Sequence, residues 1–273
     1  MSATAGSHRN AIHPAIVLPL DAAMRRLASR VLLALAWRQP AALPFVCSVD
    51  AGPAGAKRTG NREARGPIAS APLEAAIARA FAEVTDLRER EEAILWGHPV
   101  EDQIRVFLCF TLGAPGADPE RLHEVLEAVH RTARDHFGGS ALEVHAVTLV
   151  PHDEDETAVG AAAARAYRQL HAVEGLCLHG PGAAPGAGVD FAWLLECRTR
   201  AGGHVPDTDE VSDAAAHMLA TLIQDPTAAA ASAPPGRTGS RHLERAAVYS
   251  SFGIATVDFR PNVIVRLVAA RLA

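Results

Sequence analysis

This 273-residue sequence is poor in several features that mark particular classes of protein. Lys57 is its only lysine, and although lysine and arginine together number 26, the formal net charge is −5. Such a balance gives no overall positive field that would attract nucleic acid. Aromatic residues make up only 5% of the chain against 49% hydrophobic residues, so we expect a core of mainly aliphatic side chains.

Marks of export and of membrane insertion are also lacking. The four cysteines are scattered and form no C-x-x-C pair, which favours buried, reduced thiols over disulfides. No apolar run is long enough to span a bilayer, and the first residues do not follow the signal-peptide order of charge, apolar stretch and cleavage site. We therefore expect a cytoplasmic protein that binds neither membranes nor nucleic acid.

What the sequence does contain is a regular alternation of short apolar runs and segments of helical periodicity. The expected strands cover residues 15–18, 45–49, 105–112, 142–150, 191–197 and 249–259. The expected helices follow Asp21 or span about 72–90, 119–137, 157–174, 207–222 and 263–272. This order predicts the α/β fold class, a Rossmann-like three-layer sandwich with a mostly parallel sheet covered on both faces.

The expected domain organisation has one folded unit at residues 14–225, after a flexible N-terminus at 1–13. Residues 226–241 are rich in alanine, proline and glycine and are interpreted as a linker or long loop. Residues 242–273 are expected to add a strand and a helix to the same domain. Because this end is apolar, it either packs on the sheet, the reading we prefer, or docks on a partner.

The loops after the strands are the places to look for a ligand, because α/β sheets bind ligands beyond the carboxyl ends of their strands. A phosphate loop needs glycine and free N–H groups at a helix N-terminus. The first loop has no glycine, and its Asp21 is predicted to cap the next helix. The loop after Leu112 keeps Gly113 and Gly116, yet Pro115 has no N–H and Asp118 adds negative charge.

The order of these pieces resembles the nucleotide-binding domain of the tubulin/FtsZ superfamily, with bacterial tubulin-like proteins the closest in pattern. The likeness is carried by PAIVLPLDAAMRRLASRVL, FVCSVDA, RVFLCFTLGAPGADPERLHEVL, VHAVTLVP with AAAARAYRQLHAVE, the stretch from FAWLLEC to HMLATLI, and GIATVDFRPNVIVRL. The resemblance implies a GTP site, with Mg²⁺, formed by Asp21, Ala22, Asp50, Gly113, Ala114, Gly116 and Asp209. It also implies a catalytic role for Asp258 in the loop that reads N-x-D-F-x-D in polymerising members.

The sequence departs from the family pattern where the phosphates would bind. The signature loop of the family reads G-G-G-T-G-[ST]-G, and its threonine falls at Pro115, its small hydroxyl at Ala117 and a glycine at Asp118. We therefore expect a degenerate domain that acts as a scaffold or interaction protein and binds GTP weakly or not at all. Its partner would be another protein or a second copy, including a full-length tubulin-like protein.

Other functions remain open at the level of sequence. An active tubulin-like GTP hydrolase or an unrelated α/β enzyme is an alternative, but no G-x-S-x-G elbow is present, and Cys47 and Cys109 lie within strands. The acidic stretch 153–156 beside His152 could hold a hard cation, although a solvated loop is the better reading. His123 and His130 are spaced to share a helical face, without an evident third ligand.

Overall fold

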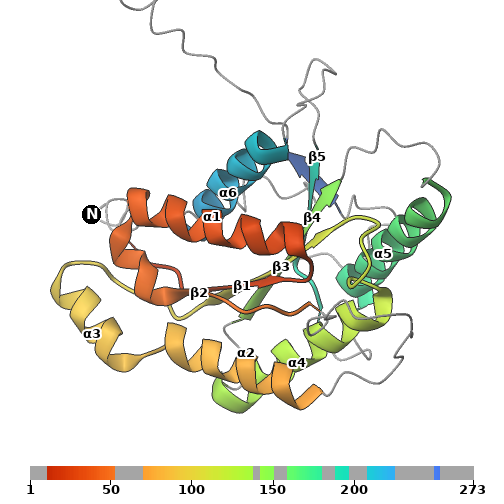
Figure 1. Cartoon of the computed structure of the whole chain (residues 1–273). Helices are drawn as coiled ribbons and strands as arrows, with labels where there is room; N and C mark the ends of the chain where they lie inside the picture. Colours follow the sequence, from red (N-terminus) through yellow and green to blue (C-terminus); the bar gives the residue numbers. More distant parts are fainter. Residues whose placement is uncertain are drawn as a thin grey trace, which may run out of the picture.

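The computed structural model describes residues 11–52, 70–137, 142–150, 159–179, 188–196, 208–224 and 249–252. Within this part of the chain, six strands form one sheet in the order β2-β1-β3-β4-β5-β6, and every neighbouring pair is parallel. The strands are β1 (Ala15–Pro19), β2 (Val46–Ser48), β3 (Ile104–Thr111), β4 (Leu142–Val150), β5 (Phe191–Glu196) and β6 (Tyr249–Phe252). The expected α/β class with a parallel sheet is confirmed (Figure 1).

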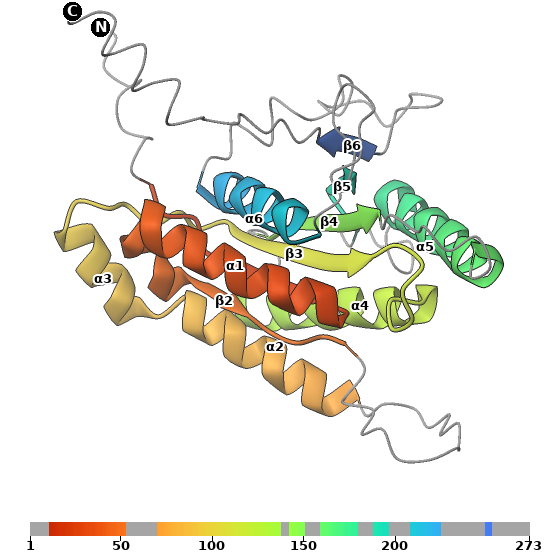
Figure 2. The ribbon, with the colours of Figure 1, turned by 45° about the horizontal axis from the view of Figure 1, so that its top comes forward.

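Helices cover both faces of this sheet. Figure 2 shows α1 and α6 on one face and α2 and α4 on the other. The helices are α1 (Ala22–Arg38), α2 (Ser70–Val84), α3 (Leu87–Leu95), α4 (Pro119–Phe137), α5 (Val159–His179) and α6 (Thr208–Gln224), with a 3-10 helix, η2, at Pro40–Phe45. A helix between consecutive parallel strands returns the chain to the starting edge of the sheet, which gives this layered arrangement.

Strand β1 illustrates how one short apolar run serves both faces. Ile16 and Leu18 belong to the core beneath α2 and α4, whereas Ala15 and Val17 belong to the core beneath α1. All four are at most 1% exposed. Because successive strand residues point to opposite faces, a strand buried on both sides reads as a continuous apolar run, and this is the pattern that the sequence shows.

The core is mainly aliphatic, as expected, but it also contains the fully buried histidine His145. His145 of β4 is fully buried, and its ring stacks between those of Phe107 and Phe191. Its Nδ1 accepts a hydrogen bond from the Trp193 indole N–H at 3.0 Å, and its Nε2 lies 2.7 Å from Glu143 Oε1. The ring is therefore neutral, with its proton on Nε2 and directed at the carboxylate.

A buried arginine links the same network to a helix end. Arg105, the second residue of β3, is 1% exposed, and its Nε lies 3.2 Å from Glu143 Oε1. Its Nη1 donates to the carbonyls of Leu222 and Ile223 in the last turn of α6. A positive charge at these carbonyls is favoured by the helix dipole. The C-terminal end of α6 therefore lies at the amino end of the strands, and its N-terminal end lies at the carboxyl end.

Three predicted boundaries are wrong. Residues 72–90 do not form one helix, because α2 ends at Val84 and Asp86 begins α3 by accepting from the N–H groups of Arg88 and Glu89. Phe45 belongs to η2 and not to the second strand. The helix expected at 157–174 continues through Gly175 to His179.

The predicted boundary of the flexible N-terminus is also placed too late. Residues 11–13 are buried, and Ile12 is fully so. Ile12 forms a parallel bridge with Val100, accepts from the N–H of Glu101 and donates to Pro99. This segment therefore packs on the domain ahead of β1, because its apolar side chain fills a small cluster with Phe45.

Candidate functional site

The topology places one candidate site at the carboxyl edge of the sheet, between β1 and β3. Strand β2 lies on one side of β1 and β3 on the other, so the connections leave β1 in opposite directions across the sheet. Such a switch point is where open α/β sheets bind ligands. The loops that the sequence singled out, after β1 and after β3, meet there.

Asp21 joins these two loops. Its Oδ1 accepts from the N–H of Met24 at 3.0 Å, which makes it the N-cap of α1 as predicted. Its Oδ2 accepts from the N–H of Thr111, the last residue of β3, at 2.6 Å. A helix N-terminus and a strand-end amide are donors that a phosphate would use. In this protein a carboxylate of the chain itself takes both of these hydrogen bonds.

The loop at Gly113 is likewise held by hydrogen bonds to side chains of the protein itself. Gly113 has φ of +80°, and its N–H donates to Oε1 of the buried Gln169 at 2.7 Å. Its carbonyl accepts from Arg165 Nε, while Gln169 Nε2 donates to the carbonyl of Ala114. A Cβ at Gly113 would lie 3.0 Å from the carbonyl oxygen of Ala162. The loop therefore fits closely against α5, and the amide of its first glycine is already bonded.

Asp50 lies after β2, and its carboxylate is also bound by groups of the protein. Its Oδ2 forms an ion pair with Arg25 Nε at 2.8 Å, and its Oδ1 accepts from the N–H of Gly52. Nearby, Arg121 of α4 is 10% exposed in its side chain and donates twice to the carbonyl of Ala51. Arg25 and Arg121 are thus both bound by groups of the chain itself.

The remaining predicted site residues divide into two groups. Ala22 is the first residue of α1, and Ala114 and Gly116 lie in the loop before α4, with Gly116 at φ of +109°. The structure therefore brings Asp21, Ala22, Asp50 and the Gly113 loop to one edge. Asp209 belongs to the first turn of α6, but its side chain is outside the described part of the chain, as is the whole of Asp258.

The two thiols that lie in strands β2 and β3, those of Cys47 and Cys109, are unsuited to nucleophilic catalysis. Burial raises the pKa of Cys47 to about 12, with a further contribution from Glu83. Burial also raises the pKa of Cys109, which lies on β3 close enough to Asp21 to be affected by its charge. A thiol must ionise to attack, so these cysteines are inert core residues, as predicted.

Metal ligands do not gather in the described residues, where no group of three or more His, Cys, Asp or Glu side chains could hold an ion. His123 is exposed, whereas His130 is buried and contacts the carbonyl of Gly188. The acidic stretch 153–156 and the basic segment around Lys57 lie outside the described residues. Among the helices that the structure describes, none is both long and apolar enough to cross a membrane.

Gln169 and Arg121 are residues of this edge that the sequence analysis did not identify. Gln169 could have been found, because it falls at helical spacing from the buried Val173 and Leu176, and a buried amide needs hydrogen-bond partners. Arg121 gives no such signal, since an arginine in the first turn of a helix is normally solvated.

Comparison with protein-family models, with curated proteins and with solved structures finds no match to this chain.

Proposed function

We propose that this chain is a degenerate tubulin/FtsZ-like domain that serves as a scaffold or interaction protein and binds GTP weakly or not at all. The element order supports the resemblance on which this proposal rests. The segments that resemble the family coincide with β1–α1, β2, β3–α4, β4–α5 and β5–α6, all in one parallel sheet. This agreement is at the level of architecture, and the loss of function is argued from the site.

One observation carries the proposed loss of nucleotide binding, namely that Asp21 fills the anion position at the switch point. A phosphate placed there needs the N–H groups of Met24 and Thr111, which the carboxylate already holds. Hydrogen bonds to a charged group contribute roughly 1.5–3 kcal/mol each, so displacing two of them costs about 3–6 kcal/mol. Micromolar binding amounts to only about 8 kcal/mol.

The second phosphate loop adds to this effect. Gly113 gives its N–H to Gln169, and Pro115 has no N–H to give. A nucleotide would also place its negative charge beside Asp21. The two loops together thus offer a phosphate few donors and one repulsive carboxylate, which favours a role in interaction over GTP hydrolysis.

Titration of the purified chain with a fluorescent GTP analogue, in the presence of Mg²⁺, tests this proposal. We expect no binding at low micromolar concentration and no GTP hydrolysis above that of buffer. Saturable binding in the low micromolar range would contradict the proposal and favour the active GTP-binding alternative. Because the anion position is occupied by Asp21, the variant Asp21→Ala should become more stable to heat when inorganic phosphate is added, whereas the wild type should not.

A further inference from the structure

Helix α3 exposes apolar side chains that a helix normally buries. Ala93 is its buried residue and packs near Ile12 and Phe45. By contrast, Leu95 is 86% exposed, and Trp96, the residue that caps the helix, is 76% exposed. The helix exposes two more apolar side chains outside the row of Trp96, those of Leu87 and Ile94. Exposed apolar side chains gathered on one short element indicate an interaction surface.

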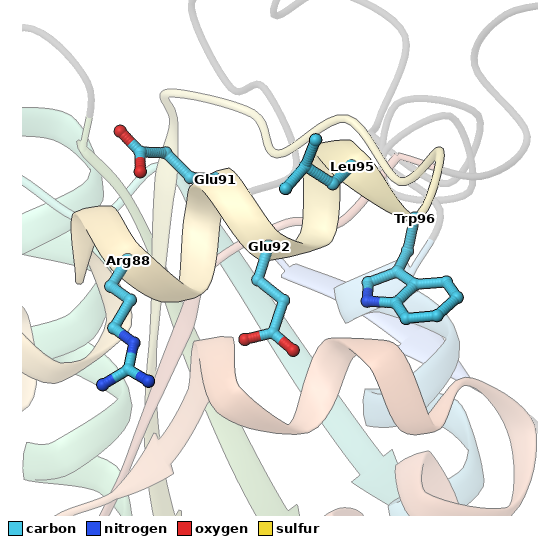
Figure 3. A pocket seen from close by; sticks show the side chains of 5 residues that line it. All are labelled: Arg88, Glu91, Glu92, Leu95 and Trp96. Atoms are coloured by element: carbon cyan, nitrogen blue, oxygen red, sulfur yellow. The ribbon is translucent and has the colours of Figure 1, made fainter.

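The shape of this surface fits another helix. In Figure 3, Arg88, Glu92 and Trp96 form one row along α3, while Glu91 and Leu95 form a second row beside it. These five residues line a shallow groove of about 510 Å³. Residues four apart form the ridges of a helix, and the groove between two such ridges receives a ridge of side chains from a partner helix. A small molecule would remain mostly in solvent there, since the walls come from a single helix.

The charges of the groove specify the partner. Two of the five lining residues are exposed carboxylates, Glu91 and Glu92, against the single cation Arg88. The other arginine of α3, Arg90, is engaged with Asp102 and with the carbonyl of Val100. Two copies of this face would bring four carboxylates together with only two arginines. Charge complementarity therefore favours a cationic partner over a second copy.

We propose that the α3 groove binds an amphipathic helix of a partner protein, one with leucine-like residues along one ridge and lysine or arginine beside them. Trp96 and Leu95 are the apolar anchors, and Glu91 and Glu92 pair with the cations. The inference goes beyond the proposed function and does not depend on it. Helix α3 comes just before the amino end of β3 in the chain. The Asp21 site lies at the opposite, carboxyl end of that strand.

Two synthetic helical peptides test the inference, one with leucine on one face and lysine on the other, and one with glutamate in place of lysine. We expect the lysine peptide to bind the wild-type chain more tightly than the glutamate peptide, as measured by calorimetry. The double variant Leu95→Ser/Trp96→Ser should weaken binding at least about tenfold. Glu91→Lys/Glu92→Lys should reverse the preference. These side chains are exposed, so circular dichroism should show unchanged folding.

A matched charge change elsewhere distinguishes an effect of the groove on binding from an effect of the overall charge of the protein. Glu120→Lys/Asp135→Lys alters two exposed acids on α4, far along the chain from α3, and should leave the preference for the lysine peptide in place. An equal reversal of the preference in this control variant would overturn the inference. So would a dimer, seen by analytical ultracentrifugation, that Leu95→Ser/Trp96→Ser dissociates, because the occupant would then be a second copy. Neither outcome bears on GTP binding.

Discussion

Asp21 joins the loops that follow β1 and β3, and its two hydrogen bonds make it structurally important. Replacing it with alanine removes the cap of α1 and leaves the N–H of Thr111 without its acceptor. Loss of a cap costs about 1 kcal/mol, and a backbone N–H left without an acceptor at this half-buried strand end costs about 1–3 kcal/mol. We therefore expect Asp21→Ala to lower the free energy of unfolding by about 2–4 kcal/mol in urea denaturation.

Asp50→Ala is the control for that measurement, because Asp50 also lies after a strand, but it accepts only from the nearby N–H of Gly52 and pairs with Arg25 at the surface, where both side chains are about half exposed. Surface ion pairs contribute less than about 1 kcal/mol. Equal losses for the two variants would show that Asp21 does not bridge the loops.

Two glycines with nearly the same φ provide a second test at the level of single residues. Gly113 and Gly97 have φ of +80° and +82°. A Cβ at Gly97 would meet nothing within 4 Å, whereas at Gly113 it would lie 3.0 Å from the carbonyl oxygen of Ala162. Both alanine variants incur the left-handed strain of about 1–2 kcal/mol. We expect Gly113→Ala to destabilise the protein further, because α5 or the Gln169 bond must shift, and thermal unfolding of the pair measures the difference.

The sequence allowed half of the Asp21 interaction to be predicted. A cap is local, so an aspartate just before a helical stripe is enough to indicate the bond to Met24. The bond to Thr111 spans 90 residues and depends on β1 and β3 becoming neighbours. In the same way, the spacing of Gln169 indicates a buried amide without naming Gly113 as its partner. Contacts between distant segments require the topology, which the sequence implies only in outline.

At the scale of elements, the break between α2 and α3 is the most informative difference. The stretch after Val84 is dense in charge, and the sequence predicts that it continues the helix expected at 72–90. Asp86 instead has ψ of 122°, outside the helical range, and accepts from two N–H groups of α3. From sequence alone, an aspartate among charged residues is equally compatible with an exposed position inside a helix and with the N-cap of a new helix. Strands were predicted more accurately, because burial on both faces leaves a continuous apolar run that few other structures produce.

This reading of Asp86 predicts a local effect. We expect Asp86→Ala to destabilise α3 by about 1 kcal/mol, because its first turn loses its acceptor. Hydrogen exchange should then accelerate in the amides of α3 and stay unchanged in the buried part of α2. A uniform acceleration in both helices would indicate that they behave as one element, as the sequence first suggested.

For the whole molecule, the buried network around His145 predicts that stability falls in mild acid. Burial lowers the pKa of His145 below its usual 6.5, with Glu143 opposing this shift through its hydrogen bond. Burial also lowers the pKa of His130. The unfolded chain therefore binds protons that the folded chain does not, so stability is fully present above pH 6.5 and declines as the pH falls below it. Glu143, whose pKa is lowered by His145 and Arg105 despite burial, adds a second loss below pH 4.5.

The melting temperature should accordingly drop as the pH falls from about 6.5 to 5.5, a window in which carboxylates barely titrate. His145→Phe keeps the ring stacked between Phe107 and Phe191 but removes the titrating group. We expect this variant to be less stable than the wild type at pH 7.5, since Trp193 loses its acceptor, and yet to change less with pH. A pH slope equal to that of the wild type would place the titration elsewhere, and His130→Gln then identifies whether His130 carries it.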